Sequence, residues 1–128
     1  MHTEDEGQAP PLAGPGRHFV SFVLLALASL GPSHAPVMAR WLAKSLPGGI
    51  RPDLPALYRT LQALEREGCV SSTWATGRGP ARHMYALTDA GREALAARAD
   101  DARRSRDNLD FFLEQLCRLK RQGGSHAG

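Results

Sequence analysis

The chain has 128 residues, of which 42% are hydrophobic, and this allows one compact domain with a core of its own. The formal net charge is +3, and the positive charge is concentrated between Arg40 and His83, where seven Lys and Arg stand against three Asp and Glu. A central basic stretch favours a nucleic-acid-binding surface. The two cysteines, Cys69 and Cys117, have no metal-ligand spacing, which argues against a disulfide scaffold and indicates a reducing, cytoplasmic compartment.

The first segments are a tail and an apolar helix. Residues 1–16 hold three prolines and three glycines, and we expect a disordered tail without a secretory signal, because its charges are acidic. The segment His18–Leu30 is apolar on nearly every side of a helix, but it is shorter than the roughly 20 residues of a membrane span. It is either a plain core helix or a core helix that also packs against a partner subunit. The second interpretation places Phe19, Val23 and Leu27 in a dimer interface.

Two further helices are predicted, each with a cap and an amphipathic pattern. Gly31-Pro32 ends the first helix, and Ser33 is a candidate N-cap for the next. Asp53 is a candidate N-cap for the third helix, and Gly68 is a candidate C-cap. The residues expected to point inward are Met38, Trp41, Leu42 and Leu46 in the second helix and Leu57, Leu61 and Leu64 in the third.

After the third helix the hydrophobic pattern changes to a period of two. Strands are predicted over Cys69–Trp74 and Arg82–Leu87, joined by the glycine-rich loop Ala75–Ala81, which is too long for a tight turn and carries Arg78. A hairpin with a basic loop placed directly after three helices is a wing. The sequence therefore predicts a mostly α (α+β) fold, a winged helix-turn-helix with a two-stranded wing, over residues 17–88.

Thr88 and Asp89 are expected to cap a long helix over residues 89–121, followed by a disordered tail over residues 122–128. Two rows of mostly apolar residues run seven apart along this helix, one from Leu95 through Ala102, Leu109 and Leu116 and one beside it from Ala99 to Leu113, which Arg106 interrupts. The pattern therefore favours a C-terminal dimerisation helix over a strict coiled coil. The residues of this helix assigned to the dimer interface are Leu95, Leu109, Phe112, Leu113 and Leu116.

Several segments together resemble the PadR family of winged-helix regulators. Ala56–Leu61 followed by Leu64–Val70, with a Leu-Tyr pair and a Leu-Glu-x-x-Gly turn, is similar to that family's recognition helix and first strand. Gly77–Arg82 resembles its wing, and Tyr85–Gly91 resembles its junction between strand and long helix. The resemblance covers roughly residues 18–116. It implies a dimeric, DNA-binding transcriptional regulator that responds to an effector, and nothing in this sequence selects among effectors.

The third helix supplies most of the expected DNA contacts. With its leucines inward, a step of about 100° per residue turns the opposite face to the major groove, where Arg59 suits guanine and Gln62 suits adenine. Tyr58 has two interpretations, a phosphate contact or a half-buried core residue. The wing arginines suit the DNA backbone or the minor groove. The full set of expected DNA-binding residues is Lys44, Arg51, Pro55, Ala56, Tyr58, Arg59, Gln62, Arg78 and Arg82.

These patterns predict a dimeric, effector-responsive repressor that binds a palindromic operator in double-stranded DNA. Two alternatives stay open: a winged-helix adaptor that binds protein instead of DNA, and a thiol-based redox-sensing regulator that uses Cys69 or Cys117. The five histidines are scattered and form no constellation with a nucleophile. We therefore expect no enzyme activity, no metal, no cofactor and no membrane association. The effector, the operator sequence and the target genes stay open.

Overall fold

The computed structural model describes residues 16–48 and 52–127. The chain divides into two compact units, one ending at Ala96 and the other beginning at Ala97. The tail expected over residues 1–16 lies outside the described residues except for Gly16. No helix in the described ranges is long and apolar enough to cross a membrane.

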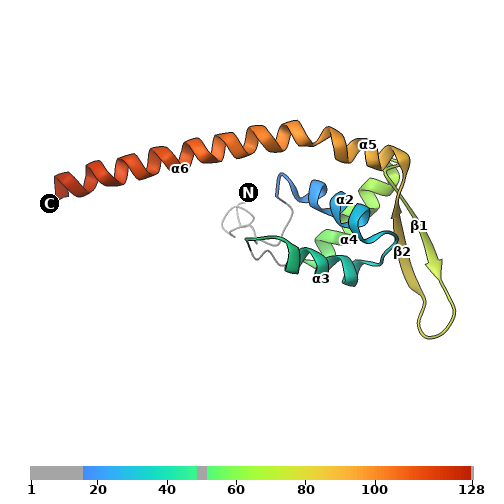
Figure 1. Ribbon diagram of the computed structural model, residues 1–128. Coiled ribbons are helices and arrows are strands. Elements are labelled where there is room, and N and C mark those ends of the chain that lie inside the picture. The colour runs from blue at the N-terminus through green and yellow to red at the C-terminus, as the bar shows by residue number, and fades with distance from the viewer. Residues whose placement is uncertain (1–15, 49–51, 128) are drawn as a thin grey trace, which may run out of the picture. The chain divides into compact units, whose positions relative to one another are not determined.

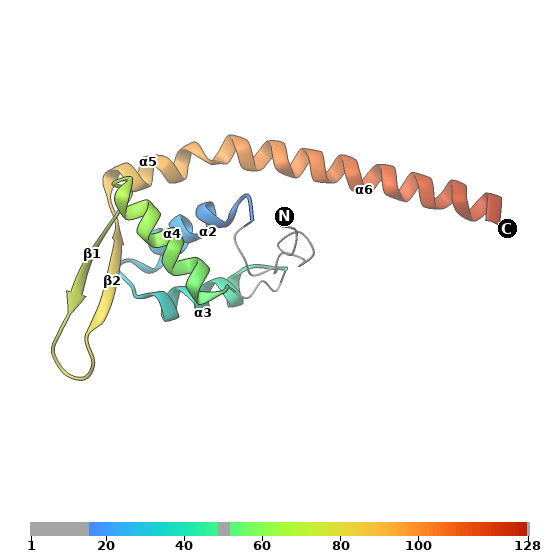
Figure 2. The ribbon, with the colours of Figure 1, turned by 180° about the vertical axis from the view of Figure 1, so that it is seen from behind.

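The first unit is a winged helix, as predicted. Three helices pack together, and a two-stranded hairpin extends beyond them in both views (Figures 1 and 2). In chain order its elements are α2 (Phe19–Leu30), α3 (Ala35–Ser45), α4 (Leu54–Arg66), β1 (Val70–Ala75), β2 (Arg82–Leu87) and α5 (Asp89–Ala97).

Helix α2 lies at the centre of the core. Val23, Leu24 and Ala26 are completely buried, because α2 contacts α3, α4 and β2. Full burial of a Val or Leu side chain contributes about 1.5–3 kcal/mol. The prediction that Phe19, Val23 and Leu27 face a partner subunit is wrong, because they are 5%, 0% and 1% exposed within their own unit. These three residues of α2 are covered within their own subunit, whereas Leu25 stays 42% exposed.

Helix α4 begins at the predicted cap. The Asp53 carboxylate accepts a hydrogen bond from the backbone N–H of Ala56 at 3.2 Å, which satisfies one of the free donors of the first turn. The predicted inward stripe is confirmed, since Leu57 and Leu61 are completely buried and Leu64 is only 4% exposed. These contacts fix which face of α4 is left open to solvent.

The hairpin has a simple antiparallel register. Val70 lies opposite Leu87, and Ala75 lies opposite Arg82. The bounds of β2 are those predicted, whereas β1 is shifted by one residue toward the loop. Val70 is buried and Ala75 is exposed, so the hairpin begins inside the core and ends in solvent.

A short pairing joins the hairpin to the loop before α3. The backbone N–H of Ser33 donates to the carbonyl of Tyr85 at 3.0 Å, and the N–H of Tyr85 donates to the carbonyl of Ser33 at 2.8 Å. The Ser33 hydroxyl donates to the carbonyl of Gly31 at 3.1 Å. The prediction that Ser33 caps α3 is wrong, because the N-cap position is His34, which makes no side-chain cap. The backbone of Ser33 is instead used to extend the sheet.

The end of α4 and the start of α5 are held together at what we call the Thr88 joint, formed by Gly68, Cys69, Thr88 and Gly91. The Thr88 hydroxyl accepts from the N–H of Gly91 at 3.0 Å and donates to the carbonyl of Gly68 at 2.7 Å. The N–H of Thr88 donates to the carbonyl of Cys69 at 3.0 Å. Thr88 thus caps α5, as predicted. A Cβ on Gly91 would overlap the carbonyl oxygen of Cys69, so only glycine permits this close approach.

The second unit is formed by the long helix α6 (Ala99–Ala127). The single helix predicted over residues 89–121 is instead divided at Arg98, although the N–H of Ala102 still donates to the carbonyl of Arg98 at 3.1 Å. The helix also continues past Arg121, where a disordered tail was expected. Glycine in a helix interior costs about 1 kcal/mol but leaves the backbone hydrogen bonds intact, so the glycines near the end do not stop the helix.

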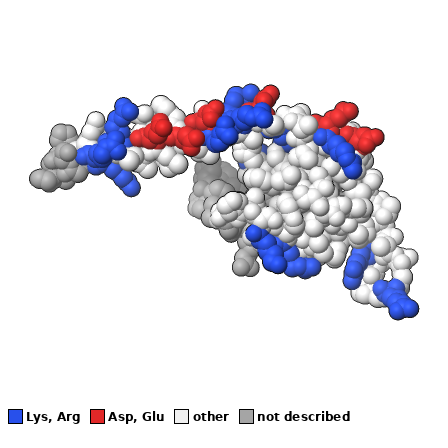
Figure 3. Space-filling view, in the orientation of Figure 1, with Lys and Arg blue, Asp and Glu red and all other residues white. Residues whose placement is uncertain are grey.

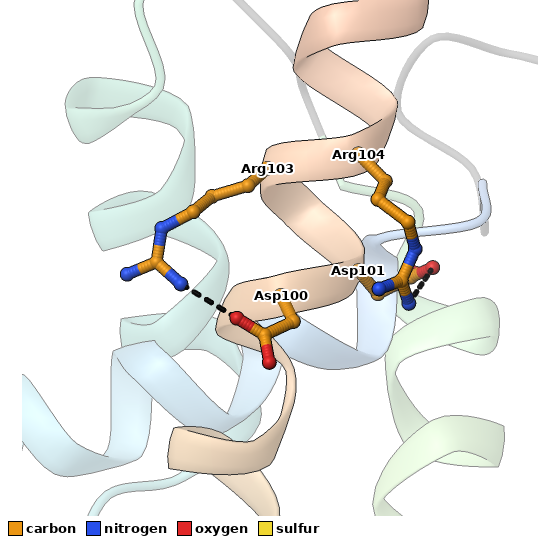
Figure 4. A network of polar contacts seen from close by, with 4 residues as sticks. All are labelled: Asp100, Asp101, Arg103 and Arg104. Atoms are coloured by element: carbon orange, nitrogen blue, oxygen red, sulfur yellow. Dashed lines mark hydrogen bonds and ion pairs between the residues drawn. The ribbon is translucent and has the colours of Figure 1, made fainter.

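Ion pairs stabilise the first turns of α6. Arg103 Nη1 lies 2.8 Å from Asp100 Oδ1, and Arg104 Nη2 lies 3.7 Å from Asp101 Oδ1 (Figure 4). Each pair is spaced i, i+3 along the helix, where side chains are neighbours. Such solvent-exposed pairs contribute only about 0.3–0.5 kcal/mol each.

Candidate nucleic-acid interface

The exposed face of α4 lies opposite its buried leucines. Pro55, Arg59 and Gln62 are exposed there, which a contact with DNA bases requires. Tyr58 is 37% exposed, so its ring is partly packed while the rest reaches solvent. The prediction that Ala56 faces the bases is wrong. Its methyl group is only 2% exposed, and such a short side chain cannot reach past the residues that cover it.

The loop of the hairpin carries the second group of cations. Arg78 and Arg82 are both exposed. Gly77 and Gly79 flank Arg78, and Gly79 has a φ of 79°, a left-handed backbone conformation that favours glycine. The loop therefore presents Arg78 on a turn of exposed, small residues, and Arg82 follows at the start of β2, so no large side chain of the loop blocks approach to a DNA groove.

Among the described residues visible in Figure 3, one edge of the first unit is basic without acidic side chains. In this view, Lys and Arg lie at two places along the lower edge, near α3 and at the hairpin loop, whereas toward the upper edge they lie beside Asp and Glu. Lys44 is exposed in the last turn of α3, and Arg51 lies outside the described residues. Arg40, also exposed in α3, was not among the predicted contacts. The amphipathic pattern of α3 places Arg40 on the outward face, and this position could have marked it as a candidate contact.

A row of aromatic side chains lies on one face of the hairpin, and we call Trp74, His83 and Tyr85 the aromatic row. Trp74 and His83 are cross-strand partners whose rings stack, with centroids 4.5 Å apart and an interplanar angle of 14°. His83 and Tyr85 also lie 4.5 Å apart, tilted by 33°. The Tyr85 hydroxyl is 3.2 Å from Nδ1 of His83, a hydrogen-bonding distance. The sequence predicted that Trp74 and His83 lie in the two strands of the hairpin, but it did not predict that their rings stack.

The face that carries the aromatic row is turned toward α4. Ser72, the cross-strand partner of Tyr85, donates a hydrogen bond of 2.6 Å to the Glu65 carboxylate of α4. Burial raises the pKa of the Tyr85 hydroxyl above its ordinary value, and the nearby Glu65 and Tyr58 of α4 raise it further. The aromatic row therefore begins in the core beside α4 and runs outward to Trp74, which is 63% exposed.

Large apolar side chains stay exposed on α6. We call five of them the apolar stripe: Leu109, Phe112, Leu113, Leu116 and Leu119. The first four were assigned to the dimer interface from the sequence, and their exposure is what such an interface requires. Leu95 does not belong with them, because it is partly buried against the core of the first unit. Phe111, 63% exposed, was not predicted and lies about 200° around the helix from Leu109, opposite the stripe.

Both cysteines are free thiols. Cys69 is partly buried and packs against the core, whereas Cys117 is exposed on α6 and accepts a contact of 3.2 Å from Nη1 of Arg121. Within residues 16–48 and 52–127, no group of three His, Cys, Asp or Glu side chains is placed to hold a metal ion.

Three packed helices followed by a hairpin with a basic loop define a winged-helix protein of the kind that regulators use. The family model described as "Transcriptional regulator PadR-like family" matches residues 23–97, which is more than half of the chain. The chain therefore belongs to the PadR-like family of transcriptional regulators.

Solved structures of the same fold agree with this assignment. A PadR-family transcriptional regulator from Eggerthella lenta is 27% identical, with 73% of this chain and 82% of that chain covered and a TM-score of 0.60. A putative transcriptional regulator from Thermoplasma acidophilum is 22% identical, with 74% and 89% covered and a TM-score of 0.65. Bacillus subtilis PadR, solved in complex with operator DNA, is 23% identical, with 65% and 47% covered and a TM-score of 0.56. The chain matches none of the curated proteins.

Proposed function

We propose that this protein is a dimeric transcriptional repressor that binds a palindromic DNA operator and releases it when an effector binds. The observation that carries the proposal is the exposed face of α4. Arg59 and Gln62 lie there opposite the buried leucines, and the exposed Arg78 and Arg82 of the hairpin accompany them. The operator complex of Bacillus subtilis PadR, which shares the fold, supports double-stranded DNA as the ligand.

In this proposal α4 is the recognition helix and the hairpin is the wing. The guanidinium of Arg59 reads guanine through O6 and N7, and the amide of Gln62 reads adenine. Tyr58, half open on the flank of α4, donates its hydroxyl to a phosphate. Arg78 and Arg82 contact the DNA backbone or the adjacent minor groove, which positions the protein without reading sequence.

Dimerisation supplies the second half-site. One winged helix reads too few base pairs for specificity, whereas a two-fold dimer reads a palindrome. The apolar stripe of α6 is the surface that we assign to this contact, because its leucines and Phe112 are 38–62% exposed in a single chain.

The competing function is an adaptor that uses the winged helix to bind another protein. In the thiol-based alternative only Cys117, exposed on α6, has the accessibility that a reactive thiol needs, because Cys69 packs against the core. Selection of bound sequences from a pool of random duplexes distinguishes the two functions, because a repressor enriches one operator sequence and an adaptor enriches none. If the purified dimer binds no duplex even at low salt, the protein is not a DNA-binding repressor.

Arginine variants then test the docking of α4 and the wing. Titrations of Arg59→Ala against operator and scrambled duplex should show operator binding weakened by about 1–3 kcal/mol, with preference lost at one base position. Arg78→Ala should weaken both duplexes alike and lower the salt slope by about one. Arg104→Ala, an exposed arginine of α6, is the matched control and should bind as the wild type does. Full operator preference in Arg59→Ala would contradict the docking of α4.

A further inference from the structure

The hairpin presents one large side chain that neither the core nor the proposed base contacts account for. Trp74 is 63% exposed at the outer end of the aromatic row. One face of its ring stacks on His83, so the exposure comes from the other face and the edges of the indole. A tryptophan can donate one hydrogen bond, through Nε1, and accepts none. None of the described contacts of Trp74 involves that donor.

The position of Trp74 limits what it can meet. Val70, Ser72 and Trp74 alternate along β1 and share one face, and the hydrogen bond from Ser72 to Glu65 shows that this face is turned toward α4. Trp74 lies two residues beyond Ser72 along this face, toward the loop that holds Arg78. It therefore stands between the helix proposed to enter the major groove and the loop proposed to contact the next groove. One DNA strand separates those two grooves.

The charge around Trp74 favours a polyanion. The hairpin from Val70 to Leu87 contains no Asp or Glu, whereas it contains Arg78 and Arg82. Arg82 is the cross-strand partner of Ala75, the residue next to Trp74. The neighbouring residues Thr73 and His83 are polar, so Trp74 is not the centre of an apolar patch of the kind that docks another protein.

We propose that Trp74 is a further DNA contact. Its indole N–H donates to a phosphate oxygen of the DNA strand that separates the groove entered by α4 from the groove contacted by the Arg78 loop. His83 is its positioning residue, because stacking on the His83 ring of β2 fixes the plane of the indole. This inference rests on the proposed function. Since phosphates carry no sequence information, the contact strengthens binding to every duplex equally.

The conservative variant Trp74→Phe separates this role from a purely structural one. Phenylalanine keeps an aromatic ring to stack on His83, but its ring is smaller than the indole and has no N–H donor. We expect Trp74→Phe to bind operator and scrambled duplex about tenfold more weakly, the effect of losing one hydrogen bond to a charged group. Unchanged affinity for both duplexes would overturn the proposal.

A fluorescence measurement tests the contact directly. Trp41, partly buried against the core, is the other tryptophan, and Trp41→Phe leaves Trp74 as the single emitter. In this variant a mixed-sequence duplex should protect the emission from quenching by acrylamide. Duplex binding, seen by the anisotropy of labelled DNA, without protection of Trp74 would overturn this inference and leave the proposed function standing. No binding of duplex by the wild type would refute the proposed function, and this inference with it.

Discussion

The winged-helix unit and α6 treat their apolar residues in opposite ways. In the winged helix, residues from α2, α3, α4 and both strands make one core, in which Leu24 and Met38 are completely buried. In α6 no side chain is buried as far as Gly123, and six of the ten large hydrophobic side chains exposed in the described residues lie there. The first region can be stable within one subunit, whereas α6 gains apolar burial only by association. In the proposed dimer, the winged helix folds within one subunit and α6 supplies the contact between subunits.

The largest effect should come from a charge in the apolar stripe. Leu113, 58% exposed, is expected to become buried in a two-fold dimer, so Leu113→Asp removes two buried leucines, one from each subunit. At about 1.5–3 kcal/mol each, the dissociation constant should rise roughly 100- to 10,000-fold. Analytical ultracentrifugation over a range of concentrations measures this rise.

The control for that experiment is Arg118→Asp. Arg118 is exposed and lies about 180° around α6 from Leu109, so it faces away from the stripe. The same aspartate placed there should leave the dimer intact and both variants equally helical by circular dichroism. Dissociation by both variants would show that the contact is not confined to the stripe.

A glycine in each region gives the next comparison. Gly91→Ala places a Cβ against the carbonyl oxygen of Cys69, so α5 must shift, at a cost of about 1–3 kcal/mol or more. The thermal unfolding midpoint should fall by roughly 5–20 °C. In Gly123→Ala the new Cβ meets no atom within 4 Å, so this variant should unfold at or above the wild-type temperature. An unchanged midpoint in Gly91→Ala would contradict the close approach at the Thr88 joint.

The cap at the Thr88 joint should have a moderate effect. Thr88→Ala removes both the bond from the Gly91 N–H and the bond to the Gly68 carbonyl, so the free energy of unfolding should fall by about 1 kcal/mol. Thr88→Ser keeps the hydroxyl and should lose much less. Urea titrations of the two variants measure the difference, and equal losses would show that the hydroxyl is not what stabilises the junction.

The smallest effect, absent at neutral pH, concerns Tyr85. Its folded-state pKa is raised above the ordinary 10.0 by burial, so the native state holds the phenolic proton more tightly than the unfolded chain does. The resulting stabilisation is complete below pH 10 and is lost as the pH rises through the folded-state pKa. Urea titrations across that window should show a steeper loss in the wild type than in Tyr85→Phe. Parallel losses would mean that Tyr85 does not titrate differently in the two states.

The sequence was sufficient wherever a local rule decides the structure. Asp53 and Thr88 are caps because their side-chain oxygens can reach free N–H groups, and both caps are present. Period-two alternation located both strands of the hairpin to within one residue.

It was insufficient wherever the answer depends on what covers a residue. Periodicity marks Phe19, Val23 and Leu27 as buried, but it does not say whether the cover belongs to the same subunit, and here it does. Ala56 lies at the side of the exposed face of α4 and is buried by the packing of the unit, which helical periodicity does not reveal. The break between α5 and α6 falls at Arg98, where the sequence has no glycine or proline that would predict it. The aromatic row depends on the register of the two strands, which alternation alone does not determine.

The Thr88 joint connects the segment that follows α4 directly to the first turn of α5. The carbonyls of Gly68 and Cys69, which follow α4, accept hydrogen bonds from Thr88. Gly91 lies so close to the carbonyl of Cys69 that no Cβ would fit between them. A change in the angle between α4 and α5 would break hydrogen bonds of this joint, so we expect the two helices to move together. The orientation of α4, which carries Arg59, is therefore expected to follow that of α5.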